Sequence, residues 1–487
     1  MGFFGRRAWL SLVVGTAAAT AAGVRVRSGR AQGGTATADP RIKHVVVLML
    51  ENRSFDHILG LLMRDIPDLR GVHGGDYSNR DKNGTRFDLT DGAEYQGQFP
   101  IDPPHEFEDV ALQLYGAGDP PPDVPTMGGF ALSYQRGGGD PANVMRCFRP
   151  EQLPALTALA KHYLVCDNWF ASVPASTPPN RQFAHFGTSF GQVDSTLIWL
   201  GHGKGIYGRL EAAGKKGRIY YFSPQSGTFG MTFLGSNYFG LYGDFLADCH
   251  RGNLPDYAFV EPPYHDQQDG TLAADQHPDN FVLAGDRFIW NVYRAIRSND
   301  TVWRSTLLLI VWDEHGGLFD HVRPPRLPYG DSFRSIKPKF DFDQLGVRVG
   351  AVVVSPYVRP GVDHTLFEHA SIPATVTQQF IGDPSHHAPY LREKRANTML
   401  RLLADIAPRM EWPSVKGAPT VKASPALSAP ASSFQLEHVQ EVYSVLAHRQ
   451  PRVARLLDPS TVRTKREVSA FIAKAMAVLH PRLGTET

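Results

Sequence analysis

The chain has 487 residues, enough for one large domain or two ordinary ones, and its 42% hydrophobic and 20% charged residues predict that most of it folds. The formal net charge of +2 argues against a nucleic-acid-binding protein, which would carry a basic excess. Three cysteines (Cys147, Cys166 and Cys249) without a Cys-x-x-Cys pair indicate neither a disulfide framework nor a zinc ribbon, although one pair could form in an oxidising compartment.

Residues 1–38 have the layout of an export signal. The segment holds five arginines and no acid, so without it the formal net charge falls from +2 to −3. Arg6 and Arg7 precede a mildly apolar, alanine-rich core, and small residues at 36–38 offer a cleavage site. This pattern is similar to a twin-arginine signal, and we expect the export machinery that reads such signals to deliver the protein to the periplasm or outside the cell. An uncleaved anchor or a disordered tail is the alternative, although the core is short for a membrane span.

Residues 39–410 are expected to form one α/β domain with a central, mostly parallel sheet flanked by helices. Apolar runs rich in β-branched residues predict the strands, at 45–50, 219–222, 307–312 and 351–354. Helices are predicted over 154–162, 207–213 and 280–297. Long Gly/Pro/Asp-rich loops are expected over 65–105, 115–143 and 261–280, and loops of that length are usually functional or mobile.

Oxygen-bearing side chains follow the first and third predicted strands. Glu51 and Asn52 come directly after the first, and Asp313 and Glu314 after the third. In open α/β sheets ligands bind at the carboxyl ends of the strands, so these side chains meet at one rim if the two strands are neighbours. Such oxygens with nearby histidines suit Mg, Mn, Ca or Zn, and the sequence does not choose among them. Each pair taken alone also fits a helix-capping role.

A hydroxyl and a guanidinium occur together in the segment 175–181 (ASTPPNR). Thr177 precedes two prolines, which disfavour helical backbone angles, so we expect it on a shaped loop. A hydroxyl beside a divalent cation becomes a nucleophile because the metal lowers its pKa. Arg181 could hold an anionic oxygen in a bidentate fork. Alone, the segment also fits an ST-turn beside a structural arginine.

Three histidines lie close to prolines in predicted loops: His105, His277 and His321. A typical loop histidine is solvated or caps a helix. Three of them beside acids instead indicate general acid catalysis or stabilisation of charge in a transition state.

The segment 187–191 (GTSFG) fits the G-x-S-x-G pattern of serine esterases. A nucleophile elbow needs a buried strand immediately before it, and the preceding run 180–185 (NRQFAH) does not have that pattern. A serine carboxylesterase is therefore a remote alternative.

The remainder of the chain is expected to comprise two further parts. Residues 411–433 are rich in Pro, Ala, Ser and Lys and predict a linker. Residues 434–487 predict a short helical segment, with an apolar pattern at Val439, Val442, Tyr443 and Leu446.

Together these segments resemble the bacterial phosphoesterase family that contains the non-haemolytic phospholipases C and the respiratory-burst-inhibiting acid phosphatases. Matching blocks run in order from residue 40 to about 400: 44–60 (HVVVLMLENRSFDHILG), 102–105 (DPPH), 165–181 (VCDNWFASVPASTPPNR), 275–278 (DQHP) and 312–322 (WDEHGGLFDHV). Residues 362–365 (VDHT) and 369–372 (HASI) match a further block. The resemblance implies an alkaline-phosphatase-like fold.

The resemblance also implies roles for residues of this chain. The positions that match the family's metal ligands and nucleophile are Glu51, Asn52, Thr177, Asp313 and Glu314, and those that match its active-site histidines are His105 and His277. Ala175-Ser176 departs from the usual Gly-Pro before the nucleophile, and Gln276 departs from a common Asp. The large C-terminal β domains of some phospholipases C have no counterpart. These departures bear on the substrate class more than on the chemistry.

The resemblance thus implies hydrolysis of phosphoric esters with a divalent metal ion and a phosphothreonine intermediate on Thr177. A phospholipase C-like reaction on a phospholipid is the preferred expectation, and an acid phosphatase acting on phosphomonoesters is the alternative. A secreted binding protein that kept the fold is a further, non-enzymatic alternative. Aromatic residues make up 11% of the chain, but no membrane-inserting amphipathic helix is evident, and the sequence gives no oligomeric state.

Overall fold

The computed structural model describes residues 37–118, 122–194, 203–222, 238–266, 270–278, 280–415, 427–431 and 433–479. The predicted export signal therefore lies outside the described residues, except for its last two positions. Within the described ranges, no helix has both the length and the apolar character that crossing a bilayer requires.

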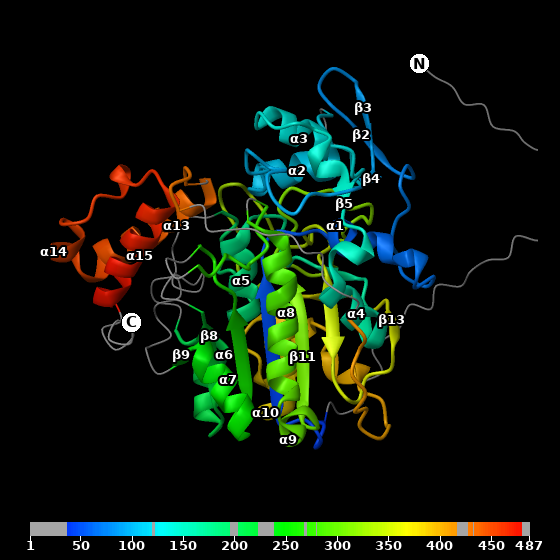
Figure 1. The fold of residues 1–487 in the computed structure, drawn as a ribbon, viewed down its shortest axis with the longest axis vertical. Helices are drawn as coiled ribbons and strands as arrows, with labels where there is room; N and C mark the ends of the chain where they lie inside the picture. Colours follow the sequence, from blue (N-terminus) through cyan, green and yellow to red (C-terminus); the bar gives the residue numbers. More distant parts are fainter. Residues whose placement is uncertain are drawn as a thin grey trace, which may run out of the picture. The chain divides into compact units, whose positions relative to one another are not determined.

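The core of the described chain is an eight-stranded sheet with the order β13-β6-β12-β11-β1-β10-β8-β9 (Figure 1). Its strands are β1 (His44–Leu50), β6 (Leu164–Cys166), β8 (Gly217–Tyr221), β9 (Phe239–Leu241), β10 (Tyr257–Glu261), β11 (Thr306–Trp312), β12 (Ala351–Val354) and β13 (Gly361–Asp363). β12 runs antiparallel to both of its neighbours, and all the other pairs are parallel. The predicted mostly parallel sheet is confirmed, and the four predicted strands all belong to it.

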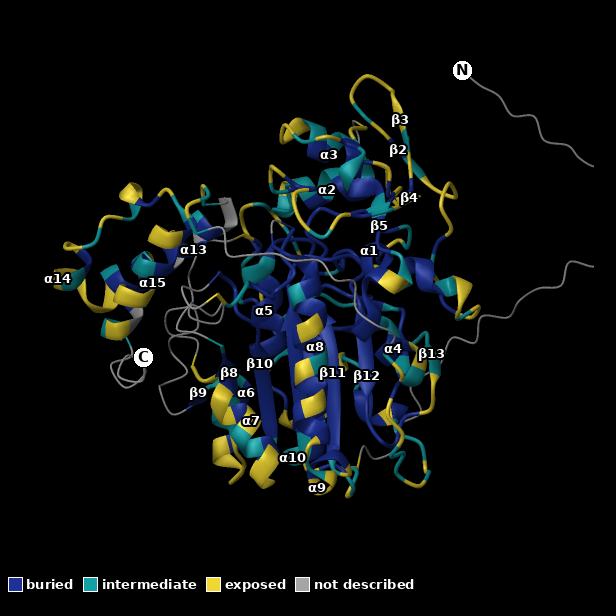
Figure 2. Ribbon diagram, viewed as in Figure 1, coloured by how far each residue is buried: buried dark blue, intermediate teal, exposed yellow. Residues whose placement is uncertain are grey.

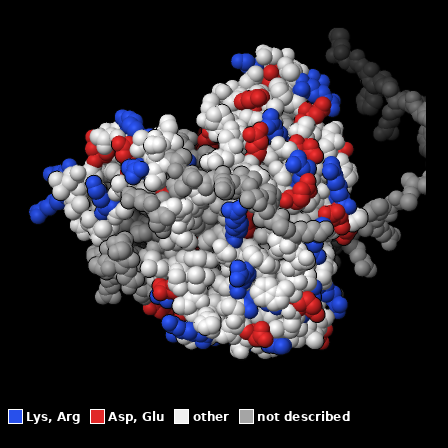
Figure 3. All heavy atoms as spheres, viewed as in Figure 1, with Lys and Arg blue, Asp and Glu red and all other residues white. Residues whose placement is uncertain are grey.

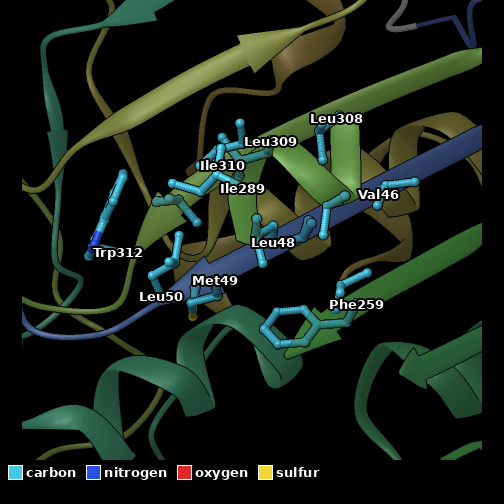
Figure 4. Packing of buried hydrophobic residues seen from close by; sticks show 14 of the residues in the cluster. Val46, Leu48, Met49, Leu50, Phe259, Ile289, Leu308, Leu309, Ile310 and Trp312 are labelled. Carbon is cyan, nitrogen blue, oxygen red and sulfur yellow. The ribbon is translucent and has the colours of Figure 1, made fainter. Parts of the chain in front are cut away.

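The central strands are buried along their length because helices cover both faces of a sheet of this kind. Every residue of β10 and β11 is buried, and so is every residue of β1 after His44. The helices pack in two groups. One contains α4 (Pro154–His162), α7 (Tyr242–Arg251) and α8 (Val282–Arg297), and the other contains α5 (Thr177–Phe186), α6 (Gly205–Ala212) and α10 (Ser371–Phe380). Figure 4 shows the resulting packing, in which Ile289 of α8 lies over side chains of β1 and β11.

The sequence of α8 has the pattern of a surface helix, with one buried side and one exposed side. Val282, Ile289, Val292 and Ile296 recur at helical spacing and are buried in the same hydrophobic cluster as the sheet. The opposite side forms an exposed stripe along the helix (Figure 2). On the face of the molecule drawn in Figure 3, basic and acidic side chains are interspersed, which agrees with the small formal net charge.

The remaining elements lie outside the eight-stranded sheet and the two helix groups. The helices are α1 (Phe55–Leu59), α2 (Phe107–Tyr115), α3 (Phe130–Arg136), α9 (Asp300–Trp303), α11 (Pro384–His387), α12 (Leu391–Arg395), α13 (Ser433–Arg449), α14 (Pro451–Ala454) and α15 (Lys465–Leu479). The strands are β2 (Ser78–Arg80), β3 (Arg86–Asp88), β4 (Thr90–Asp91), β5 (Arg146–Cys147), β7 (Trp169–Phe170) and β14 (Phe367–Glu368). Two of the segments predicted to be loops also contain regular secondary structure. Residues 65–105 include the β2–β3 hairpin, and residues 115–143 include α3. Cys147, Cys166 and Cys249 are free and buried.

The C-terminal segment is helical, as expected, and it packs on the residues that follow β10. Val439, Val442 and Leu446 of α13 are buried in the same hydrophobic cluster as the sheet. The rings of His438 on α13 and His265 stack, with His265 Nε2 2.9 Å from His438 Nδ1. The described part of the tail is thus held close to the strand that ends on Glu261.

Candidate active site

The candidate site lies where three neighbouring parallel strands end. β1 is flanked by β10 on one side and β11 on the other, with Leu50 opposite Trp312. The residues after Leu50 and Trp312 therefore lie side by side, and the backbone amide of Asn52 donates to Asp313 Oδ1 at 3.1 Å. The expectation that these two strands are neighbours with their acidic ends at one rim is confirmed.

β10 adds a carboxylate that the sequence analysis missed. The strand is a fully buried apolar run that ends on Glu261, the same pattern that singled out Glu51 and Asp313. Glu261 is itself fully buried. The signal was therefore present in the sequence, but this run was assigned neither to a strand nor to the site.

Arg181 binds the carboxylates of all three strands. Its guanidinium forms ion pairs with Glu51 at 3.2 Å, with Glu261 at 3.3 Å and with Asp313 at 3.0 Å. The side chain is only 1% exposed, and neighbouring acids hold the pKa of Arg181 well above its usual range against the effect of burial. Protein carboxylates thus occupy its fork in this structure, and the binding of a substrate's anionic oxygen by Arg181 stays a prediction.

Thr177 is the first residue of α5, not a loop residue as predicted. Prolines are tolerated in the first turn of a helix, where their missing amide hydrogens would have no intrahelical acceptor. The helix N-terminus carries a partial positive charge, which favours an oxyanion or phosphate close to the Thr177 hydroxyl. Thr177 is partly exposed, and its Oγ1 donates to Asn52 Oδ1 at 3.3 Å.

Asn52 connects the parts of the site. Besides Thr177 and Asp313, it lies near a histidine, with its Nδ2 3.5 Å from His105 Nε2. Its φ of +57° is a left-handed conformation that asparagine adopts more readily than most residues. Gly316 packs directly against it, since a Cβ at Gly316 would lie 2.5 Å from the carbonyl oxygen of Asn52.

His105 lies beside Asn52, and His277 lies next to His105. Their ring centroids are 6.4 Å apart, and His277 Nε2 lies 3.5 Å from Asp102. His105 Nε2 lies 3.9 Å from Glu314. Burial opposes protonation of His105, but the charges of Glu314 and Asp102 outweigh it and raise the pKa of His105 to about 10. His105 is therefore a cation at neutral pH.

His321 belongs to another cluster, which corrects its grouping with the other two histidines. Its Nδ1 lies 2.7 Å from Asp56, and Arg348 forms ion pairs with Asp56 at 2.8 Å and with Asp320 at 3.1 Å. Asp56, Asp320 and His321 offer ligand atoms within 4.8 Å of one another. Arg348 pairs with both acids and compensates one of their two charges, and His321 lies against Asp56, so this buried network fits a structural role.

His369, by contrast, lies in the site, although the sequence analysis gave it no role. Its Nε2 contacts the carbonyl oxygen of Asp313, and Trp169 Nε1 donates to its Nδ1 at 3.3 Å. Burial lowers the pKa of His369 to about 4, so the ring is neutral and supports the backbone under the acidic rim.

The predicted metal-binding residues fit a divalent cation by charge. The four carboxylates at the three strand ends face two cations, Arg181 and His105, so with all four acids ionised two negative charges would be in excess. Buried charges are costly unless they are compensated. Burial raises the pKa of Glu51 well above its usual range, and among the described residues neither of its carboxylate oxygens accepts a hydrogen bond. Oε1 of Glu314 likewise accepts none within that part of the chain.

The serine-esterase pattern at 187–191 does not form a nucleophile elbow. It follows α5, a helix, whereas the elbow requires a strand. Ser189 is fully buried, and its hydroxyl donates to the carbonyl oxygen of Gln192 at 2.7 Å. That alternative is wrong.

A model of the phosphoesterase family matches residues 42–381. The chain belongs to this family. This phosphoesterase is 36% identical over 410 residues to non-specific phospholipase C4 of Arabidopsis thaliana, covering 78% of the chain and 74% of the relative. It is 29% identical over 403 residues to phospholipase C B of Mycobacterium tuberculosis, covering 70% and 73%.

The family assignment makes the protein a phosphoric ester hydrolase. Among solved structures, the chain matches a Vibrio parahaemolyticus protein of the alkaline phosphatase superfamily with a TM-score of 0.36 and 10% sequence identity. The match covers 75% of this chain and 71% of that protein. The predicted fold class, a mostly parallel α/β sheet flanked by helices with a helical C-terminal tail, is confirmed by the sheet itself.

Proposed function

We propose that this phosphoesterase is a metal-dependent, phospholipase C-like enzyme that uses Thr177 as its nucleophile. One observation carries the proposal: a partly exposed hydroxyl at the N-terminus of α5 lies 3.3 Å from Asn52, above a buried rim of carboxylates. The phospholipase C names of its relatives support the choice of a phosphodiester lipid as the substrate.

The residues that would hold a divalent cation are Glu51, Asn52, Asp313, Glu314 and Thr177. When bound, such an ion polarises a phosphoryl oxygen and lowers the pKa of a neighbouring hydroxyl. The identity of the ion, whether Zn, Mg, Mn or Ca, is left to metal analysis. Arg181 holds the carboxylates of the three strands in place by its ion pairs, so that their oxygens keep a fixed arrangement.

Thr177 Oγ1 would attack phosphorus while the bond from phosphorus to the glycerol oxygen breaks on the opposite side. Because Thr177 is partly exposed, its proton can leave to solvent. Cationic His105 would neutralise charge on the phosphoryl oxygens, and His277 would give a proton to the departing alcohol. These two roles could be exchanged. Water would then hydrolyse the phosphothreonine and release the phosphorylated head group.

The nucleophile is tested by removing one hydroxyl at a time. Thr177→Ala should lower turnover of a soluble chromogenic phosphodiester by about 10³-fold or more, with unchanged folding and metal content. Ser176→Ala is the matched control, because its neighbouring hydroxyl donates to Glu106 instead of Asn52 and should retain most activity. Acid quenching during turnover should trap one phosphoryl group on the peptide that contains Thr177. Unchanged turnover by Thr177→Ala would refute the assignment.

The alternative substrate class is a phosphomonoester, as for an acid phosphatase. Both classes need the same nucleophile and cation, so only relative turnover separates them. We expect phosphatidylcholine to be hydrolysed with a higher kcat/KM than a simple phosphomonoester, with loss of both activities after chelation. The reverse preference would make the protein a phosphatase.

We also propose that residues 1–38 direct export through the twin-arginine machinery to the periplasm or beyond. The paired Arg6 and Arg7 ahead of an apolar core support this. Replacing both arginines with lysine should leave the protein in the cytoplasmic fraction of a bacterial host. Export of that variant at the normal level would contradict the proposal.

A further inference from the structure

A short hairpin extends from the long segment that connects β11 to β12. Ser335 and Phe340 exchange two backbone hydrogen bonds, of 3.0 and 3.2 Å, and so close a turn whose tip is residues 336–339. The sequence of this tip is Ile-Lys-Pro-Lys. We call these four residues the hairpin tip.

The apolar residue of the hairpin tip is almost completely exposed. Ile336 is 85% exposed, the highest value for a large hydrophobic side chain in the described ranges, and Leu456 on the C-terminal segment follows with 81%. An exposed isoleucine gains free energy whenever it moves from water into an apolar phase. At the end of a hairpin it can do so without any change in the fold.

The charges around Ile336 define which apolar phase fits. Lys337 and Lys339 are exposed, and neither has an acidic group within ion-pair distance in the described chain. Two nearby arginines are engaged, Arg334 with Asp341 at 3.3 Å and Arg326 with Asp343 at 3.2 Å. An exposed aliphatic side chain followed by two lysines that make no ion pair in the described chain suits an anionic phospholipid surface.

The hairpin borders a cavity whose wall includes residues close in sequence to His105 and Thr177. The cavity has a volume of about 610 Å³, and its walls include Lys339, Phe340, Phe107 and Pro174. The rings of Phe340 and Phe107 are 5.0 Å apart. Phe107 begins α2, two residues after His105, and Pro174 lies three residues before Thr177. The hairpin and the cavity therefore share one surface, and two residues of the cavity wall belong to the chain segments that carry His105 and Thr177.

We propose that the hairpin tip docks the enzyme on a phospholipid bilayer, with Ile336 among the acyl chains and Lys337 and Lys339 against lipid phosphates. The proposal rests on the phospholipid substrate proposed above and adds how that substrate is reached. Docking at this place brings the cavity beside the catalytic segments to the lipid surface. A lipid molecule could then reach Thr177 without first leaving the bilayer for water.

Binding to vesicles tests the proposal separately from catalysis. Vesicles of equal parts phosphatidylcholine and phosphatidylserine are sedimented with wild type, Ile336→Glu, Lys337→Glu/Lys339→Glu and, as matched control, Leu456→Glu. We expect Ile336→Glu to lower the partition coefficient about tenfold or more, because it replaces an inserted side chain by a charge. The double lysine variant should lose binding on these vesicles far more than on pure phosphatidylcholine, and its loss should shrink at high salt. Leu456→Glu should bind like wild type.

Turnover of the soluble phosphodiester should be the same in wild type, Ile336→Glu and Leu456→Glu, because neither Ile336 nor Leu456 lies in the site or in the cavity wall. The docking proposal would be overturned if Ile336→Glu bound vesicles as well as wild type, or if Leu456→Glu lost as much vesicle binding as Ile336→Glu. It would also be overturned if wild type did not bind the vesicles. If the soluble diester is not hydrolysed by wild type, the proposed function fails. The sedimentation measurement still decides the docking proposal in that case.

Discussion

Replacing Arg181 with glutamine removes the one guanidinium that three buried carboxylates share. Its ion pairs with Glu51, Glu261 and Asp313 span 3.0–3.3 Å, and none of the four side chains is more than 1% exposed. Removing one partner of a buried ion pair costs about 3–5 kcal/mol, since the remaining charge stays buried without compensation. We therefore expect the free energy of unfolding to fall by about that amount, measured by urea titration.

The same titration, repeated with a chelator and with excess divalent cation, tests whether a metal shares these carboxylates. A cation at about 100 times its dissociation constant adds about 2.7 kcal/mol to the folded state. It should stabilise Arg181→Gln more than wild type, because the variant has one more uncompensated negative charge. Chelation should therefore widen the difference in stability between Arg181→Gln and wild type.

Arg348→Gln is the matched control, because Arg348 is equally buried and also binds two carboxylates, Asp56 and Asp320. It should lose a similar amount of stability, with no change in response to metal. A loss below about 1 kcal/mol in Arg181→Gln would refute the electrostatic argument. An equal metal response in Arg348→Gln would refute the location of the metal and favour the cluster around Asp56.

The remaining predictions concern pH and backbone geometry. The pKa of His105 is raised from 6.5 to about 10, so the stability that its proton contributes is complete below about pH 6.5 and is lost as the pH rises through 10. His105→Asn should flatten the pH dependence of unfolding over that window and lower kcat, and an unchanged pH profile would contradict the assignment. Gly316→Ala places a Cβ 2.5 Å from Asn52 at a φ of +63°, so it should cost about 1–3 kcal/mol by thermal unfolding and lower kcat through displacement of Asn52. Gly243→Ala, where a Cβ meets nothing within 4 Å inside α7, is its control and should be neutral or slightly stabilising.

The two strand-end predictions needed nothing beyond the sequence. A buried parallel strand is an apolar run, and its carboxyl end is where the next polar residues must lie. Glu51 with Asn52 and Asp313 with Glu314 could therefore be assigned to one rim before the sheet was known. Thr177 was singled out by residue type, by the prolines and by the family resemblance.

Other features depended on contacts that local sequence does not encode. The partners of Arg181 include residues 132 and 80 positions away, so its ion pairs follow from the strand order and not from the ASTPPNR segment. His321 follows directly after Asp320 in sequence, yet the chain turns it toward Asp56 and away from the other histidines. The rule for residues before proline disfavoured a helix at Thr177, but the first turn of a helix tolerates proline, and α5 begins there.

The sequence by itself thus determined four strands of the sheet, the acidic ends of two of them and the family, because each is written in short runs of residue types. The tertiary structure decided how the charges of that rim are balanced. Glu261 joins it only because β10 lies beside β1, and Arg181 reaches all three strands only because α5 packs at their ends. Charge compensation among buried groups depends on distances of a few ångströms between segments far apart in the chain, and only the folded protein fixes those distances.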